Sequence, residues 1–237
     1  ASQLYSGGPF DSHSVTVSSD SLGTLVFAGE GGSSAATSID GTAAGDIWDS
    51  FDGVGATAAI KVLDSSPGHN SFFYTLPSMM DGLSIFGNYK PQGTGGESST
   101  GIGFTYSGFE GLSASYAVTD IETGTATTSG DQTAWKISYA YGPVTVGYGK
   151  FYVVPAGNTG TAEETDYVQY YENDMYSIGV AANDNLTISY TTEDSVVEKQ
   201  QGDAATTQKT DSSVESNITA IQAAYTMGGM TLSVSTK

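Results

Sequence analysis

The chain has 237 residues, with 26 acidic against seven basic side chains, which gives a formal net charge of −19. All seven basic residues are lysines. A surface of this charge repels phosphate backbones, which argues against nucleic acid as a partner. Cysteine is absent, so disulfides, thiolate metal sites and thiol nucleophiles are excluded.

Hydropathy points away from a helical membrane protein. The sequence contains no run of about 18 apolar residues, so no transmembrane helix is predicted. Charged residues make up only 14% of the chain, while glycine contributes 31 residues and tyrosine 15. Long uncharged stretches that are not continuously apolar are compatible with strands that cross a membrane as a barrel.

The main pattern is an alternation of apolar and small polar residues, repeated in hairpins along the whole chain. After residue 134, for example, Trp135, Ile137 and Tyr139 share one strand face, and Lys136 and Ser138 share the other. Six such hairpins predict about twelve antiparallel strands. In chain order, the expected pairs are 15–19 with 24–29, 72–76 with 83–89, 102–106 with 112–118, 135–141 with 144–149, 176–182 with 186–192, and 221–227 with 230–235.

The connections between these strands alternate in length. Short turns join the two strands of each hairpin, and long acidic connections are expected at about 30–70, 90–100, 119–132, 153–173 and 194–215. The polar faces of the expected strands carry Ser, Thr, Gly and Ala with hardly any charge, unlike the outer faces of soluble β proteins. Short turns at one end, long loops at the other and tyrosines near strand ends are typical of outer-membrane barrels.

Several segments resemble the general-diffusion porins of alphaproteobacteria, in particular those of marine species. The resemblance lies in segments spread in order over nearly the whole chain, which are Phe10–Val15, Ser21–Leu25, Asn70–Pro77, Gly111–Tyr116, Tyr139–Val146 and Tyr225–Thr231. It implies an all-β fold, an antiparallel transmembrane β-barrel of porin type in which this chain supplies about twelve of sixteen strands. It also implies that residues 1–237 form a single barrel domain in the bacterial outer membrane.

The same resemblance carries functional expectations. A porin is not an enzyme; it lets small hydrophilic solutes and ions diffuse passively, usually as a homotrimer surrounded by outer-membrane lipid and lipopolysaccharide. The third loop of a porin folds into the lumen, and only the 30–70 connection is long enough for that role. If so, the first strands and the closing strand are missing, and the chain is expected to be an internal portion of a longer protein.

Charged residues near the expected constriction are the candidate site residues. Carboxylates in a narrow lumen concentrate cations, which predicts a cation-preferring pore. The acidic candidates, all in the 30–70 connection, are Asp40, Asp46, Asp49 and Asp52. The basic candidates are Lys61 in that connection and Lys90 and Lys136, whose strand parity directs them to the lumen.

Other chemistry has little support in the sequence. Two histidines and no cysteine leave few routes to a catalytic triad or a transition-metal site, and no catalytic residue or cofactor is assigned. Acidic loop clusters such as Glu163, Glu164 and Asp166 are candidates for calcium, although they lack EF-hand spacing. The alternative function is a secreted or surface-exposed β-rich adhesin or carbohydrate-binding protein, which would stay in buffer without detergent.

Overall fold

A computed structural model describes residues 13–39, 68–91, 97–123, 129–156, 167–203, 208–228 and 230–236. Twelve strands form one antiparallel sheet, and a 3-10 turn, η1 (Ala36–Ser38), follows the second strand. The strands are β1 (His13–Ser19), β2 (Gly23–Gly32), β3 (Gly68–Thr75), β4 (Leu83–Lys90), β5 (Glu97–Tyr106), β6 (Leu112–Thr123), β7 (Gly130–Tyr141), β8 (Val144–Val154), β9 (Tyr167–Asn183), β10 (Leu186–Asp203), β11 (Gln208–Met227) and β12 (Met230–Thr236). No helix within the described ranges is long and apolar enough to cross a membrane.

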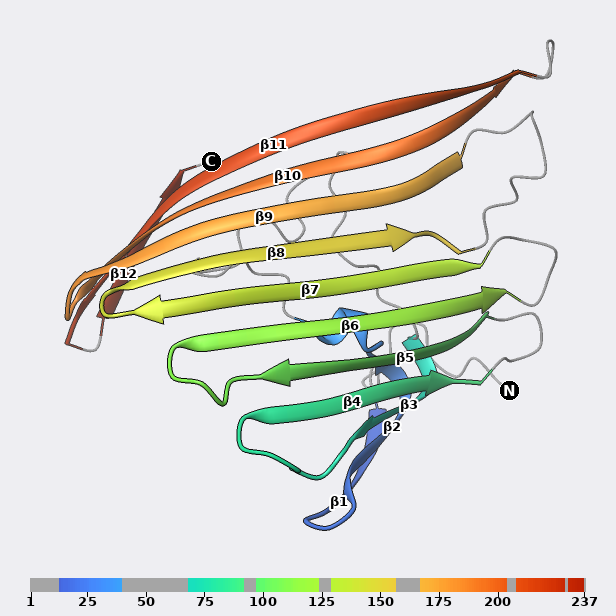
Figure 1. Cartoon of the computed structure of the whole chain (residues 1–237), viewed down its shortest axis with the longest axis horizontal. Helices are drawn as coiled ribbons and strands as arrows, with labels where there is room; N and C mark the ends of the chain where they lie inside the picture. Colours follow the sequence, from blue (N-terminus) through green and yellow to red (C-terminus); the bar gives the residue numbers. More distant parts are fainter. Residues whose placement is uncertain are drawn as a thin grey trace.

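The topology is a simple meander in which each strand pairs with the next along the chain. Figure 1 shows a curved sheet whose short turns, such as those of β5–β6, β7–β8 and β9–β10, gather at one end. The six predicted hairpins and the count of about twelve strands are therefore confirmed. Within the described sheet, β1 and β12 each leave one edge unpaired, so the sheet is open, and the sixteen-strand barrel stays a prediction.

Local sequence explains the short turns. Gly142 ends the β7 half of its hairpin with a φ of +57°, a left-handed conformation that glycine adopts without a steric penalty. In the β9–β10 turn, the side chain of Asn183 stabilises the turn instead. Its Oδ1 atom accepts hydrogen bonds from the backbone N–H groups of Asn185 at 2.9 Å and Leu186 at 3.0 Å.

The apolar strand face points outward, as the alternation predicts. Ile137 and Val146 are 43% and 46% exposed, whereas Ala134 and Phe151 on the opposite face are almost fully buried. Outward residues on neighbouring strands pack as aromatic pairs, for example Tyr148 with Tyr176 at a ring-centroid distance of 4.7 Å. A broad exposed apolar surface on a strand face is what contact with lipid requires.

The buried core lies on the concave side of the sheet rather than between two sheets. Small side chains there leave room for a segment of chain to enter, and a few large ones fill the remaining space. The cluster consists of Ala35, Ala36, Ile39, Phe86, Ala117, Ala134, Phe151 and Met175, with Phe73 packed against it.

The strands are longer than predicted and extend into the loops expected at 119–132, 153–173 and 194–215. Strand covers residues 119–123, 130–132, 153–154, 167–173, 194–203 and 208–215. Strands β9, β10 and β11 have 17, 18 and 20 residues. The sequence signal failed because the outward residues change character along one strand. Three successive outward rows, each in register across β8–β11, show this change. The first row is apolar or aromatic and consists of Val146, Ile178, Tyr190 and Ile221. The second consists of Tyr148, Tyr176, Thr192 and Thr219, and the third, which is polar and charged, of Lys150, Asp174, Asp194 and Asn217.

Candidate functional site: an inward segment on the concave wall

The segment that follows β2 turns onto the concave face of the sheet, where η1 contacts β5, β6 and β7 (Figure 1). Its first turn is stabilised by two reciprocal hydrogen bonds. The N–H of Ser34 donates to Oγ1 of Thr37 at 2.8 Å, and the N–H of Thr37 donates to Oγ of Ser34 at 3.0 Å. Ser and Thr at this spacing satisfy backbone groups that an isolated turn leaves without partners.

Three strands of the wall hold this turn through side-chain hydrogen bonds. Asn88 on β4 accepts from the N–H of Ala35 at 2.7 Å through its Oδ1 atom. Thr119 on β6 accepts from the N–H of Ala36 at 3.1 Å, and Gln132 on β7 accepts from the hydroxyl of Ser34 at 3.3 Å. All three wall residues are buried, so these bonds are shielded from competing water.

Strand β5, which lies between Asn88 of β4 and Thr119 of β6, has room only for glycine at position 101. A Cβ atom at Gly101 on β5 would lie 2.2 Å from Oδ1 of Asn88 and 2.6 Å from Oγ1 of Thr119. Real Cβ atoms do not approach other atoms so closely. Gly101 therefore leaves the space in which both acceptors reach the inward segment.

Apolar packing adds to the hydrogen bonds. Ala35, Ala36 and Ile39 are buried in the same cluster as Phe86 and Phe151 of the wall. Their small side chains allow the backbone of the turn to come close to the sheet. The turn is thus fixed to the wall by both polar and apolar contacts, and it occupies part of the space enclosed by the curved sheet.

The predicted charged site is only partly within the described structure. Asp40, Asp46, Asp49, Asp52 and Lys61 lie outside the described residues, as do the calcium candidates Glu163, Glu164 and Asp166.

The two strand lysines carry inward parity. Lys90 is opposite buried Ser99 in the β4–β5 register, and Lys136 is opposite Ser115 and Gly149. Their role in setting ion selectivity stays a prediction. Among the described residues, no group of three or more acidic or histidine side chains is arranged to hold a metal ion.

Sequence reasoning missed Asn88, Thr119 and Gln132. A weak signal was present, since Asn88 and Gln132 are amides on strand positions that alternate with the apolar outward residues. An amide on an inner wall needs hydrogen-bond partners, and here the inward segment provides them. The alternation of the strands does not show which segment the partners come from.

His13 lies at an irregularity in the β1–β2 pairing. The register shifts between His13 and Ser14, so Gly29 of β2 falls between their two partners, Glu30 and Ala28. The shift pairs His13 with Glu30 and lays its imidazole over Gly29, where a Cβ atom would be 2.0 Å from Nε2. A β-bulge of this kind redirects a side chain, which the sequence alternation cannot reveal.

A second group of polar contacts lies on the outward face of β8–β11, next to the aromatic residues. Lys150 on β8 forms ion pairs with Glu172 at 2.8 Å and Asp174 at 3.1 Å on β9. Tyr148 donates a hydrogen bond to Asp174, and Asn217 donates one to Asp194. Tyrosines followed by charged residues along the same strand face mark the boundary between lipid and its headgroup layer.

A curved antiparallel meander with an apolar outward band and a buried inward segment defines the class of outer-membrane β-barrel proteins. Two solved structures agree, both of OmpT, an outer-membrane protein of Vibrio cholerae. The loop-L8 deletion mutant is 12% identical with a TM-score of 0.58, over 95% of this chain and 74% of that one. Outer-membrane expressed OmpT is 11% identical with a TM-score of 0.59, and the match covers 95% of this chain and 68% of the OmpT chain.

At this identity the likeness concerns the fold alone. No protein-family model and no curated protein matches the chain. The chain thus has the fold of an outer-membrane β-barrel protein, as the sequence predicts, and the outward apolar band agrees with the predicted location in a bacterial outer membrane. The more specific resemblance to alphaproteobacterial porins stays a prediction.

Proposed function

We propose that the protein is a porin, a passive diffusion channel for small hydrophilic solutes and ions in the outer membrane. The observation that carries the proposal is the hydrogen-bonded, buried contact between Ser34–Ile39 and the concave wall. A segment held inside a curved sheet narrows the passage while leaving the wall intact. We further propose a homotrimer in contact with lipopolysaccharide, and no catalytic activity.

Conductance tests this proposal directly. The full chain, reconstituted into planar lipid bilayers, is expected to open discrete ion-conducting channels without an energy source. Replacing residues 40–67 by a short Gly-Ser linker, which keeps the turn that binds the wall, should raise the single-channel conductance. If the chain does not conduct at all, the proposed channel is wrong. If it conducts but the replacement leaves the conductance unchanged, residues 40–67 do not form the constriction.

Cation preference is the second part of the proposal. It rests on the net charge of −19 and on the carboxylates of the 30–70 connection. We expect a reversal potential of cation-selective sign under a salt gradient, weakening as salt rises, because exposed charges are screened beyond about 10 Å at 0.1 M salt. Asp46→Asn with Asp49→Asn should move the potential toward zero. The matched control is Asp184→Asn in the β9–β10 turn, which should have little effect.

The alternative of a soluble adhesin or carbohydrate-binding protein meets a physical objection. Its outward strand faces would have to be solvated, but Ile102, Ile137 and Ile178 are 60%, 43% and 42% exposed on that face. Such a surface would promote aggregation in water. Extraction separates the two: a porin requires detergent, and a soluble adhesin does not.

A further inference from the structure

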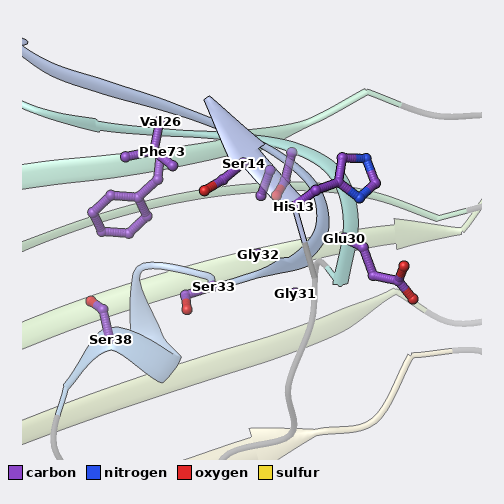
Figure 2. A pocket seen from close by; sticks show the side chains of 11 residues that line it. His13, Ser14, Val26, Glu30, Gly31, Gly32, Ser33, Ser38 and Phe73 are labelled. Carbon is purple, nitrogen blue, oxygen red and sulfur yellow. The ribbon is translucent and has the colours of Figure 1, made fainter. Parts of the chain in front are cut away.

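A pocket of about 390 Å³ lies between the concave side of β1–β3 and the first residues of the inward segment (Figure 2). Val26 and Phe73 lie at one end of it, Ser33 and Ser38 face it from the inward segment, and His13 and Glu30 stand at the opposite end. Pockets for small ligands have volumes from about 300 Å³ upward, so this one suits a compact solute.

Three serine hydroxyls line the pocket without a hydrogen bond to the described part of the protein. Within the described part of the chain, no hydrogen bond engages the hydroxyls of Ser14, Ser33 or Ser71, although all three line the pocket. Ser14 and Ser33 are exposed, and Ser71 is only 2% exposed. The Oγ atom of Ser71 is not among the buried atoms that lack a hydrogen bond, so it is open to the pocket, where water or a ligand can complete its hydrogen bonds.

Glycine keeps the innermost hydroxyl accessible. A Cβ atom at Gly32 would lie 2.0 Å from Oγ of Ser71 and 3.2 Å from Cβ of Ala28. Any larger residue at position 32 would fill the space beside that hydroxyl. The backbone at Gly32 thus leaves open the side of Ser71 that faces the pocket.

One aromatic ring supplies an apolar surface beside these hydroxyls. Phe73 stacks on Phe86 with ring centroids 5.5 Å apart, which fixes the ring in the wall, and it also lines the pocket. Hydroxyls that both donate and accept, next to a fixed apolar ring, complement a neutral ligand that has many hydroxyls and one apolar face.

We propose that this pocket is a binding subsite for a saccharide that passes through the channel. The inference rests on the proposed channel function, because diffusion through the lumen brings the solute to the pocket. The hydroxyls of Ser14, Ser33 and Ser71 bond the sugar hydroxyls, and Phe73 contacts a C–H face of the ring. No charged group is needed for this recognition, so Glu30 belongs to the rim and not to the contact.

Sucrose is the probe, tested on the full chain in planar bilayers. It should lower the conductance in a saturable way, whereas triethylene glycol, which lacks a dense array of hydroxyls, should not. In the double variant Ser14→Ala with Ser71→Ala, the half-saturating sucrose concentration should rise about tenfold, as expected for the loss of two hydrogen bonds. Ser115→Ala on the inward face of β6, away from the pocket, is the matched control and should behave like the native protein.

The remaining outcomes separate the inference from the function it rests on. A chain that conducts but shows no saturable sucrose effect overturns the subsite and leaves the channel intact. If Glu30→Gln abolishes the effect while the serine variant keeps it, the pocket recognises charge and the saccharide assignment is wrong. Isothermal titration of sucrose into the detergent-solubilised chain measures binding without conduction, so absent heat of binding overturns the subsite even if no channel forms.

Discussion

The sheet has a short-strand wall, β1–β5, and a long-strand wall, β9–β11, which differ in strand length relative to the thickness of a membrane. Strands of the first have 7 to 10 residues, and those of the second have 17 to 20. A tilted strand needs only about 9–11 residues to cross a bilayer. The strands of the short-strand wall are therefore at most about as long as one crossing of the apolar layer requires, and those of the long-strand wall continue well beyond it.

Their outward faces reflect this difference. On the short-strand wall, exposed outward residues include Phe27 and Phe72, whose ring centroids are 5.1 Å apart. On the long-strand wall, the outward face of β9 changes from Ile178 through Tyr176 to Asp174 within two steps of the alternation. Successive outward residues are about 6.6–6.8 Å apart, so the boundary between lipid and water spans one or two rows of side chains.

The largest expected effect tests where that boundary lies on a single strand. Ile188 is in the middle of the apolar part of β10, which runs from Leu186 to Tyr190, whereas Val196 lies beyond Asp194 on the same face. Ile188→Lys should lower the free energy of unfolding by about 2–4 kcal/mol, and Val196→Lys by about 0–1 kcal/mol. Urea titration of folding into lipid vesicles measures both. Equal costs would show that the long-strand wall does not leave the membrane at this level.

An intermediate effect concerns the inward segment, which is hydrogen-bonded to β4, β6 and β7. The long-strand wall forms none of these three bonds. Asn88→Ala leaves the buried N–H of Ala35 without its acceptor and should destabilise the protein by about 1–3 kcal/mol. Open-channel current should also become noisier as the turn loosens. Asn217→Ala, an equivalent change on the outward face of β11, serves as the control. If both variants give the same current noise, the turn does not border the conducting path.

The smallest effect is expected at the ion pairs between β8 and β9. Lys150 and Glu172 are each about one-third exposed, so water and salt weaken their attraction. Lys150→Met should cost less than about 1 kcal/mol, and the cost should shrink further when unfolding is measured at high salt. Lys199→Met on β10 provides a comparison outside this cluster. A salt-independent cost of several kcal/mol would mean that Lys150 is shielded by lipid instead of lying above it.

The alternation of apolar and polar residues allowed the strands to be predicted from the sequence, but only where the outward residues face lipid. Around Trp135–Tyr139 the outward residues are apolar and the predicted faces are confirmed. Around Asp194 the outward residue is charged, so the same strand was expected to be a loop. The alternation itself continues there, since Thr191, Glu193, Ser195 and Val197 are all buried on the concave face. The outward face of one strand thus contacts lipid along part of its length and water along the rest, so apolar outward residues identify only the lipid-facing part as strand.

The sequence by itself determined the hairpins, their order, the outward apolar face and the outer-membrane class, because these depend on period-two alternation and turn residues, which are local. Tertiary structure decided how the segment after β2 meets the wall. The contacts of Ser34 with Gln132 and of Ala36 with Thr119 join residues 98 and 83 positions apart. The curvature of the sheet brings them together, and no local pattern encodes such a distance. The same curvature, with one bulge at His13, assembles the serine-lined pocket from three strands and a turn.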